Sequence, residues 1–301
     1  MTSPVIAIFL NADRGMSVFR HLSETGFEVR AGFVPPHRIT EDIRSCFADA
    51  ETPLHEAGDV NAPAFRGLLD SLEIDIAVVA GFSQIFGEEI LSVPKRGTLN
   101  LHAGRLPQYR GGSPLNWQII NGEPEAGLSV ILMDGGIDTG PVLAECAIPI
   151  DGDDTIATLH EKANAAFPPL TVAAIEAVRQ GGAFAPQDET KAVYWHQRND
   201  ADGLIDWAGR SPTEIRNFVR ALGSPYPGAF SFVGDRRVRV REVRVAEMRI
   251  DGTPGRAGFI SGTGPYVICQ GGAVLLTDYA FEDDPSATLR TGDHFAAGSR
   301  K

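Results

Sequence analysis

Asn100 and His102 are two polar residues that alternate with the apolar residues Leu99 and Leu101. On a β-strand, side chains two residues apart point to the same face, so both polar groups are expected to face the same way. They come at the end of the apolar run, where open α/β sheets bind their ligands. An Asn amide and a His ring N–H can donate to the negative charge that develops on an attacked carbonyl oxygen. We therefore predict that this pair stabilises an oxyanion.

Asp138 is the third candidate, in the Gly-rich stretch Met133–Gly140. Glycines allow the backbone of such a stretch to approach another group closely. An Asp that reaches the His would stabilise the protonated ring and hold its orientation. No Ser or Cys nucleophile is required if the amine of a substrate attacks the carbonyl itself. The three residues thus suit transfer of an acyl-type group to an amine.

Each of these features also has a structural explanation. An isolated Asn-x-His on a strand is usually structural, because short motifs are weak signals. Asp138 could cap the turn in the sequence DGGID, which is a common role for Asp. The glycines of the loop 104–112 could serve turns alone, although a loop rich in Gly, Pro and Arg can also fold over a ligand. The combination of all three features between Gly97 and Gly140 favours a site.

The elements around these residues follow an alternating pattern. Apolar runs predict strands, and segments with helical spacing lie between several of them, which indicates a parallel or mixed α/β sheet. Pro168 and Pro169 should kink or split the last helix, and Asn61 is a candidate cap for an earlier one. The predicted strands are 5–10, 27–34, 74–80, 98–101 and 128–133, and the predicted helical segments include 16–22, 68–72 and 154–180.

A second domain is predicted after a linker at residues 181–187. Residues 1–190 carry 12 Lys and Arg against 26 Asp and Glu, whereas residues 191–301 carry 15 against 13. The run Ser211-Pro212-Thr213-Glu214 matches a capping box with Pro at the first helical position. Short strands separated by Gly or Asp turns follow, as in a small β-barrel. We place the domains at residues 1–188 and 189–301.

Composition excludes several classes of protein. A net charge of −12 opposes general nucleic-acid binding, which usually needs a basic face. Three scattered cysteines form no CxxC pair, so neither a disulfide framework nor a zinc site is expected, and no metal is required. The first residues have no basic segment and too short an apolar run for a signal peptide, and no apolar stretch reaches membrane-spanning length, so we expect a cytoplasmic protein without membrane contact. The first strand is followed by LNADRG rather than GxGxxG, so a nicotinamide cofactor is not indicated.

Taken together, the motifs resemble the signature of the folate-dependent formyltransferases. The family's Asn-x-His matches Asn100-Leu101-His102, its LPxYRG loop matches residues 106–111, and its catalytic Asp in DxGxDTG matches Asp138. The resemblance covers most of residues 5–180 and continues through GLIDW (203–207) and PYPGA (225–229), as in the C-terminal part of methionyl-tRNA formyltransferases.

The resemblance implies a Rossmann-like formyltransferase domain, a C-terminal OB-like barrel, and N10-formyltetrahydrofolate as formyl donor. It implies that Asn100 and His102 stabilise the oxyanion while Asp138, through water, helps move a proton from the amine to the folate nitrogen. The same resemblance implies the binding residues. Folate binding, largely through backbone groups, is implied for Phe82, Gln84, Ile85, Phe86, Met133, Asp134, Gly135 and Asp138, and substrate binding for Arg105, Tyr109, Arg110, Gly111 and Trp117.

The acceptor amine is the open question at this level. Residues 35–42 hold one Arg and two acids, unlike the basic loop with which methionyl-tRNA formyltransferases grip tRNA, and residues 114–122 resemble sugar N-formyltransferases. We therefore expect a nucleotide-linked amino sugar, ahead of methionyl-tRNA and of hydroxyornithine in siderophore synthesis.

Two further points stay open in the sequence. Arg237, Arg239 and Arg241 share one strand face, which could bind phosphate but is more simply explained as a solvated face. A non-catalytic folate- or sugar-binding module of the same fold is the alternative of another class. A homodimer also remains open.

Overall fold

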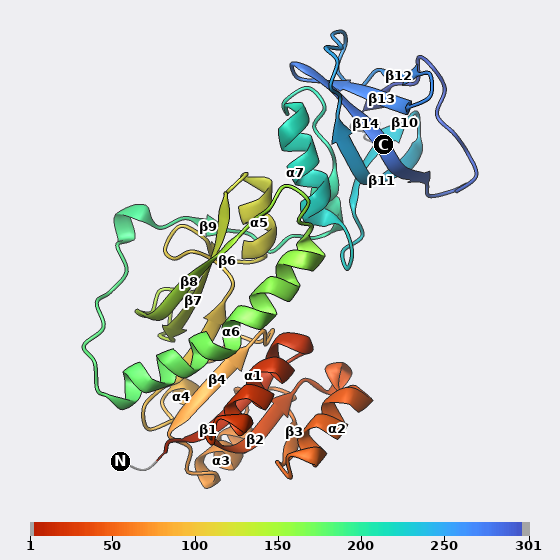
Figure 1. The fold of residues 1–301 in the computed structure, drawn as a ribbon. Helices are drawn as coiled ribbons and strands as arrows, with labels where there is room; N and C mark the ends of the chain where they lie inside the picture. Colours follow the sequence, from red (N-terminus) through yellow and green to blue (C-terminus); the bar gives the residue numbers. More distant parts are fainter. Residues whose placement is uncertain (1–2, 297–301) are drawn as a thin grey trace. The chain divides into compact units, whose positions relative to one another are not determined.

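The computed structural model describes residues 3–296 and divides into two compact units. The first unit comprises Met1–Pro114, Glu125–Pro149 and His160–Trp195, and the second comprises Leu115–Pro124, Ile150–Leu159 and His196–Lys301. Figure 1 shows the course of the chain through both. The boundary predicted at residues 188/189 stays a prediction.

A seven-stranded sheet forms the centre of the first unit, in the order β3-β2-β1-β4-β5-β7-β8. The strands from β3 to β5 pair in parallel, whereas β7 and β8 add to the sheet antiparallel. A separate short pair joins β6 to β9. The strands of this unit are β1 (Val5–Leu10), β2 (Glu28–Val34), β3 (Leu54–Glu56), β4 (Ile76–Ala80), β5 (Thr98–His102), β6 (Arg110–Gly111), β7 (Glu125–Leu132), β8 (Val142–Pro149) and β9 (Tyr194–Trp195).

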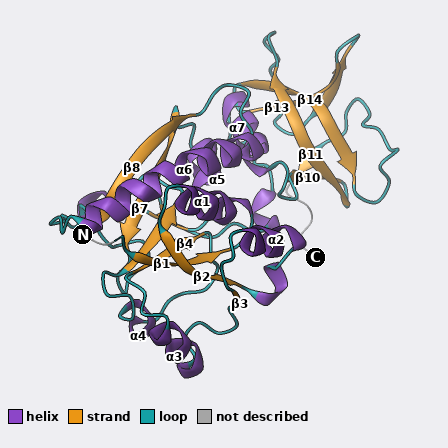
Figure 2. Ribbon diagram, turned by 60° about the horizontal axis from the view of Figure 1, so that its bottom comes forward, coloured by secondary structure: helices purple, strands orange, loops and turns teal. Residues whose placement is uncertain are grey.

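Helices cover both faces of this sheet (Figure 2). Phe9 and Phe33 stack on one face, where side chains from α3 and α4 complete an aromatic and aliphatic core. On the other face α1 lies beside α6, and Arg14 lies over the ring of Phe167. The helices are α1 (Asp13–Glu24), α2 (Glu41–Asp49), α3 (Pro63–Ser71), α4 (Glu88–Leu91), α5 (Pro114–Ile120) and α6 (Ile156–Arg179), with short 3-10 turns at Pro36–Arg38 and Glu189–Lys191.

Helix α6 runs without a break through Pro168 and Pro169, so the prediction that they could split it is wrong. A proline lacks the N–H that would bond the carbonyl four residues earlier, which for Pro168 is the carbonyl of Asn164. The hydroxyl of Ser17 on α1 donates to that carbonyl at 3.1 Å. A neighbouring helix therefore supplies a hydrogen bond that the proline cannot make.

His160 on the same helix makes the first unit sensitive to acid. Burial and the nearby Arg14 lower the pKa of His160 from 6.5 to about 4. The unfolded chain therefore takes up this proton between about pH 6.5 and 4 while the folded chain does not, so stability falls as pH falls through that window. Because His160 is partly exposed, we expect a loss on the order of 1 kcal/mol between about pH 7.5 and about pH 5.

The measurement is the free energy of unfolding in denaturant at both pH values, for the parent and for His160→Gln. The difference between the two pH values should shrink in the variant. An identical pH dependence would show that His160 contributes nothing to it.

The second unit contains a six-stranded antiparallel sheet in the order β12-β13-β14-β11-β10-β15. Its two ends meet, because Arg256 forms a bridge to His294 and Ala257 N–H donates to Asp293 O at 2.8 Å. The sheet thus closes on itself, and the predicted class, a Rossmann-like domain with a small β-barrel, is confirmed. The strands are β10 (Ala229–Val233), β11 (Arg236–Val245), β12 (Ala257–Ile260), β13 (Gly264–Cys269), β14 (Gly272–Phe281) and β15 (Phe295–Ala296).

The two predicted helix caps have different outcomes. Helix α7 (Pro212–Leu222) begins with the predicted capping box between Ser211 and Glu214, preceded by a 3-10 turn at Asp200–Gly203. The prediction that Asn61 caps α3 is wrong, because the residue before the first turn of this helix is Ala62. The Asn61 side chain instead bonds the carbonyl of Ile85 and the N–H of Gly87, and so ties together two loops of the first unit.

The arginine face of β11 is not the solvated face that the sequence suggested. Arg239 is 8% exposed and pairs with Asp200 at 2.8 Å and with Glu282 at 2.5 Å. Arg237 pairs with Asp200 at 2.7 Å and lies over the ring of Phe230. Only Arg241 remains largely exposed, 3.4 Å from Asp278. Acidic partners from distant segments account for the burial of these charges.

Replacing Arg239 should therefore cost far more stability than replacing Arg241. Arg239→Gln leaves Asp200 and Glu282 with reduced compensation, so we expect a loss of about 2 kcal/mol, moderated by hydration of the two acids. Arg241→Gln, at an exposed pair, should change stability by less than about 0.5 kcal/mol. Denaturant unfolding of both variants measures the difference, and equal losses would contradict this account of the strand.

Candidate active site

Asn100 and His102 lie on β5, at the carboxyl end of the parallel part of the sheet. They pair with Ile131 and Ser129 of β7, and both side chains reach Asp138, which follows β7. Asn100 Nδ2 donates to Asp138 Oδ1 at 3.3 Å, and His102 Nδ1 lies 3.4 Å from Asp138 Oδ2. The structure therefore brings the three residues together.

The two ring nitrogens of His102 have different partners. Nε2 lies 2.6 Å from the carbonyl oxygen of Tyr109, and because a carbonyl only accepts, Nε2 carries a proton in this contact. Nδ1 is left as the nitrogen that faces Asp138 at a long distance. A charged ring can then donate from Nδ1, while the Tyr109 carbonyl keeps the ring oriented.

Asp138 is held from a second side by the loop that contains β6. Its Oδ2 accepts the backbone N–H of Gly111 at 2.9 Å. Gly111 has φ +91°, and a Cβ at this position would collide with the carbonyl of Trp195. Only glycine therefore allows the loop to present this N–H while β9 lies against it. The side chain of Asp138 thus meets an amide, an imidazole and a backbone N–H.

The residues implied in substrate binding lie in different surroundings. Arg105 pairs with Glu125 at 2.5 Å and is partly exposed. Tyr109 is buried and stacks on Trp195. Arg110 is completely buried, which favours a role in holding the loop over direct contact with an acceptor. Their roles in binding stay predictions.

Trp117 is the implied substrate residue that belongs to the second unit. Its Nε1 donates to the carbonyl of His196 at 3.1 Å, and Arg198 lies over its ring at 4.7 Å. Both of these partners, His196 and Arg198, belong to the second unit as well. Substrate binding by Trp117 also stays a prediction.

The residues implied in folate binding come from two segments beside the aromatic core. Phe82 and Met133 both pack against that core, while Ile85 is 77% exposed. A Cβ on Gly135 would come 3.4 Å from the carboxylate of Glu88, so the two segments lie next to each other. The Gln84 amide is committed to the backbone of Gly58 and Val60, which leaves backbone groups for a ligand.

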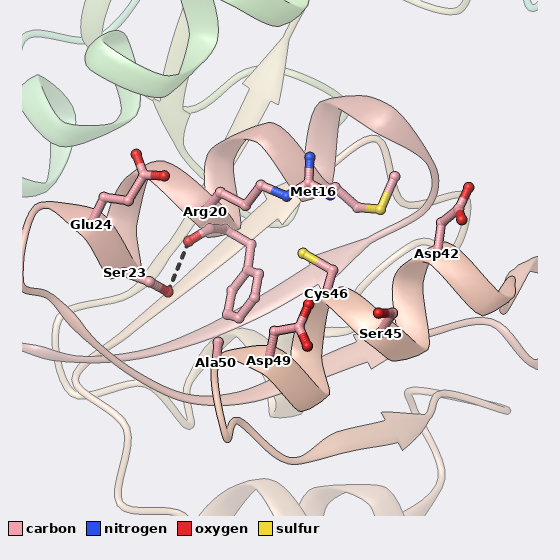
Figure 3. A pocket seen from close by; sticks show the side chains of 10 residues that line it. Met16, Arg20, Ser23, Glu24, Asp42, Ser45, Cys46, Asp49 and Ala50 are labelled. Atoms are coloured by element: carbon pink, nitrogen blue, oxygen red, sulfur yellow. Dashed lines mark hydrogen bonds between the residues drawn. The ribbon is translucent and has the colours of Figure 1, made fainter.

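A separate hollow of about 560 Å³ lies between α1 and α2 (Figure 3). Its rim carries Arg20 and the acids Glu24, Asp42 and Asp49, with Cys46 between the helices. None of the predicted site residues lines this hollow. It therefore adds nothing to the chemistry built around Asp138.

Membrane-spanning helices and metal-binding clusters are both absent from the part of the chain that the structure describes. Among residues 3–296, no helix is both long and apolar enough to cross a membrane. Within the same range, no group of three or more His, Cys, Asp or Glu side chains is arranged to hold a metal ion.

Sequence reasoning missed the segment that follows α6. Gln187 donates to the carbonyls of Asp138 and Gly140 at 2.8 and 2.7 Å, and Glu189 pairs with Arg110 at 2.6 Å. Residues 181–187 were expected to be only a linker. Nothing in their composition indicates contact with a loop almost 50 residues earlier, so the sequence held no usable signal.

A Rossmann-like sheet that carries Asn100, His102 and Asp138 at the carboxyl ends of its strands, in a chain whose second unit is a small barrel, is the arrangement expected of a formyltransferase. The family model described as "Formyl transferase" matches residues 36–175, and "Formyl transferase, C-terminal domain" matches residues 198–291. The chain is 34% identical over 245 residues to a methionyl-tRNA formyltransferase of Geotalea uraniireducens, covering 81% of this chain and 76% of that protein. The chain belongs to the formyltransferase family and is an enzyme of that class.

Solved structures show the same fold at low sequence identity. WlaRD, a sugar 3N-formyl transferase solved in the presence of dTDP and 5-N-formyl-THF, is 17% identical with a TM-score of 0.71, over 96% of this chain and all of that one. HypX from Aquifex aeolicus, solved with tetrahydrofolic acid, is 19% identical with a TM-score of 0.64 over 93% of this chain. The chain spans only 44% of the length of HypX.

Proposed function

We propose that this formyltransferase moves the formyl group of N10-formyltetrahydrofolate onto the primary amine of a nucleotide-linked amino sugar. The observation that carries the chemistry is the convergence of Asn100 and His102 on Asp138. Two donors and one carboxylate at a single point can bind a developing negative charge and take part in proton transfer. No side-chain nucleophile is needed, because the acceptor brings its own amine.

The donor supplies an activated formyl carbon bonded to a nitrogen that can leave. As the acceptor nitrogen bonds to that carbon, Asn100 donates the second hydrogen of its Nδ2 to the formyl oxygen, where negative charge develops. The charged His102 ring donates to the same oxygen from Nδ1, whose contact with Asp138 is long at 3.4 Å. The carboxylate of Asp138, through water, accepts a proton from the attacking amine and returns it to the leaving nitrogen. The carbon–nitrogen bond to the folate then breaks.

The segments around residues 82–86 and 133–138 fit a folate. Ile85 is 77% and Ile137 58% exposed, so apolar surface remains uncovered beside the aromatic core of Phe82 and Phe86. A flat pteridine ring can cover such surface, while the neighbouring backbone groups hydrogen-bond its edge. The relatives WlaRD and HypX, whose structures were solved with folates, support the same donor here.

The sugar acceptor is supported by charge as well as by the likeness to WlaRD. A tRNA partner needs arginines and lysines that are free to neutralise phosphates. Arg237 and Arg239 are already paired with Asp200 and Glu282, so the face of β11 offers little charge to such a partner. Methionyl-tRNA stays the second candidate, because the 34% identical relative carries that name.

A parallel acceptor assay tests this proposal. The full chain is incubated with N10-formyltetrahydrofolate and a dTDP-linked 3-amino sugar, methionyl-tRNA or hydroxyornithine, and formylated product is followed by mass spectrometry. We expect the highest kcat/KM with the amino sugar and a weak dependence on salt. A higher kcat/KM with methionyl-tRNA, falling steeply as salt rises, would overturn the proposed acceptor.

A further inference from the structure

The segment between α6 and the second unit folds back over the loop that contains β6. Val193 N–H donates to Pro107 O at 3.1 Å, Arg110 N–H donates to Val193 O at 3.0 Å, and Gly112 N–H donates to Trp195 O at 2.8 Å. These backbone bonds fasten residues 193–195 to the loop that contains β6, and Trp195 Nε1 adds a bond to the carbonyl of Gln108 at 3.0 Å. The side chains just before them, from residue 187 onward, make the contacts that concern the site.

Gln187 connects this segment with the loop that carries Asp138. Its Nε2 donates both of its hydrogens, to Asp138 O at 2.8 Å and to Gly140 O at 2.7 Å. Its Oε1 accepts from Nε and Nη2 of Arg110 at 3.1 and 3.0 Å. One amide thus joins the carbonyl groups of Asp138 and Gly140 to a fully buried guanidinium.

Arg110 provides a rigid anchor for that amide. Its guanidinium is completely buried and donates to both carboxylate oxygens of Glu189, at 2.6 and 2.9 Å, and to the hydroxyl of Tyr194 at 2.9 Å. A bidentate arginine–carboxylate pair defines the position of both groups as well as adding energy. Gln187 is therefore held at its oxygen end while its nitrogen end faces the catalytic loop.

Asp138 requires such support because its backbone is strained. Its φ is +54°, in the left-handed region that residues with a Cβ adopt at a cost. Conformations of this kind persist only where the surroundings hold them, and they concentrate at functional sites. The two carbonyls that Gln187 binds belong to Asp138 itself and to Gly140, on either side of Thr139. Releasing them allows the loop to relax and the carboxylate to move away from His102.

We propose that Gln187 is a positioning residue for formyl transfer, which holds Asp138 in the orientation that faces Asn100 and His102. Arg110 and Glu189 act through it by fixing the oxygen of its amide. This inference rests on the proposed catalytic role of Asp138. A purely structural role for Gln187 makes the opposite prediction, namely a loss of stability without a change in kcat at temperatures where the chain is folded.

Two variants of Gln187 test the donor function. Gln187→Ala removes the two donated hydrogen bonds and also the acceptor for Arg110. Gln187→Glu keeps an acceptor for Arg110 but turns an oxygen toward two carbonyls. We expect both to lower kcat by about 10- to 100-fold, since small displacements of reacting groups have effects of that size. KM for N10-formyltetrahydrofolate should change little. Gln180→Ala, an exposed amide earlier in the same connection, is the matched control and should behave as the parent.

The assay uses the full chain with the dTDP-linked 3-amino sugar, or with methionyl-tRNA if that acceptor is turned over faster. Each variant is also measured in the Asp138→Asn background and across a range of pH. If Gln187 acts through Asp138, its replacement should have little further effect on kcat in that background, and the pH–rate profile of Gln187→Ala should approach that of Asp138→Asn.

Two results would overturn the inference. One is parent-like kcat and pH dependence in both Gln187 variants, with only a lowered Tm. The other is an undiminished effect of Gln187→Ala when Asp138 is already Asn. Failure of the proposed catalytic role of Asp138 gives a different result, because Asp138→Asn would then retain full turnover on its own, and failure of the proposed acceptor appears in the acceptor assay.

Discussion

Replacing Asn100 with alanine is expected to lower kcat by about 10²–10³-fold, the usual consequence of losing one oxyanion donor. Asn100 Nδ2 now donates to Asp138 Oδ1, and the amide lies on the same strand face as His102. Removing it takes away a donor that acts mainly when charge develops on the formyl oxygen. The loss should therefore appear in kcat and kcat/KM alike, while KM for the folate changes little.

A partly buried asparagine elsewhere in the first unit gives the matched control. Asn164 on α6 accepts a hydrogen bond from Arg14 at 3.2 Å and contacts none of the proposed site residues. Asn164→Ala should retain turnover even if it loses some stability. If Asn100→Ala turned over at the parent rate while remaining folded, Asn100 would have to be removed from the oxyanion site.

Alternation along β5 was sufficient to place Asn100 and His102 on one face, because period two is inherent to a strand. The sequence also gave the Gly-rich stretch that brings Asp138 within reach. Contact between Asp138 and β5 depends on the antiparallel pairing of β5 with β7, which no local pattern reveals. The family resemblance, rather than periodicity, identified Asp138 as the catalytic acid of that stretch.

The features that sequence reasoning did not predict all depend on partners far away in the chain. Pro168 is tolerated within α6 because Ser17 of another helix bonds Asn164. The arginine at position 239 is buried because Asp200 and Glu282 meet it there. Gln187 lies in a segment with the composition of a linker. Local propensity describes none of these contacts, since each forms only when the tertiary fold is complete.

Asp138→Asn is expected to lower turnover by a large factor, about 10²-fold or more, while the chain remains folded and binds folate. Asn tolerates the left-handed backbone conformation that Asp138 adopts at φ +54° at least as well as Asp does. The change therefore preserves the shape of the loop. What it removes is the negative charge and one of the two acceptor oxygens.

The hydrogen-bond pattern explains why Asn cannot replace Asp here. Oδ1 accepts from Asn100 Nδ2, and Oδ2 accepts from Gly111 N–H and faces His102 Nδ1. An Asn has one acceptor oxygen and one NH₂ group, so in either orientation a donor faces a donor. One contact must be lost, and no carboxylate remains to stabilise a charged His102 or to accept the proton of the attacking amine.

The measurement is a pH–rate profile of parent and variant, combined with titration of a folate analogue to show that binding survives. Asp59 provides the control, because its carboxylate caps a turn by accepting Asn61 N–H at 2.9 Å and has no part in the proposed site. Asp59→Asn should keep parent turnover, as Asn serves equally well in such turns. If Asp138→Asn behaved in the same way, Asp138 would be a turn-capping residue, and formyl transfer would have to proceed with Asn100 and His102 alone.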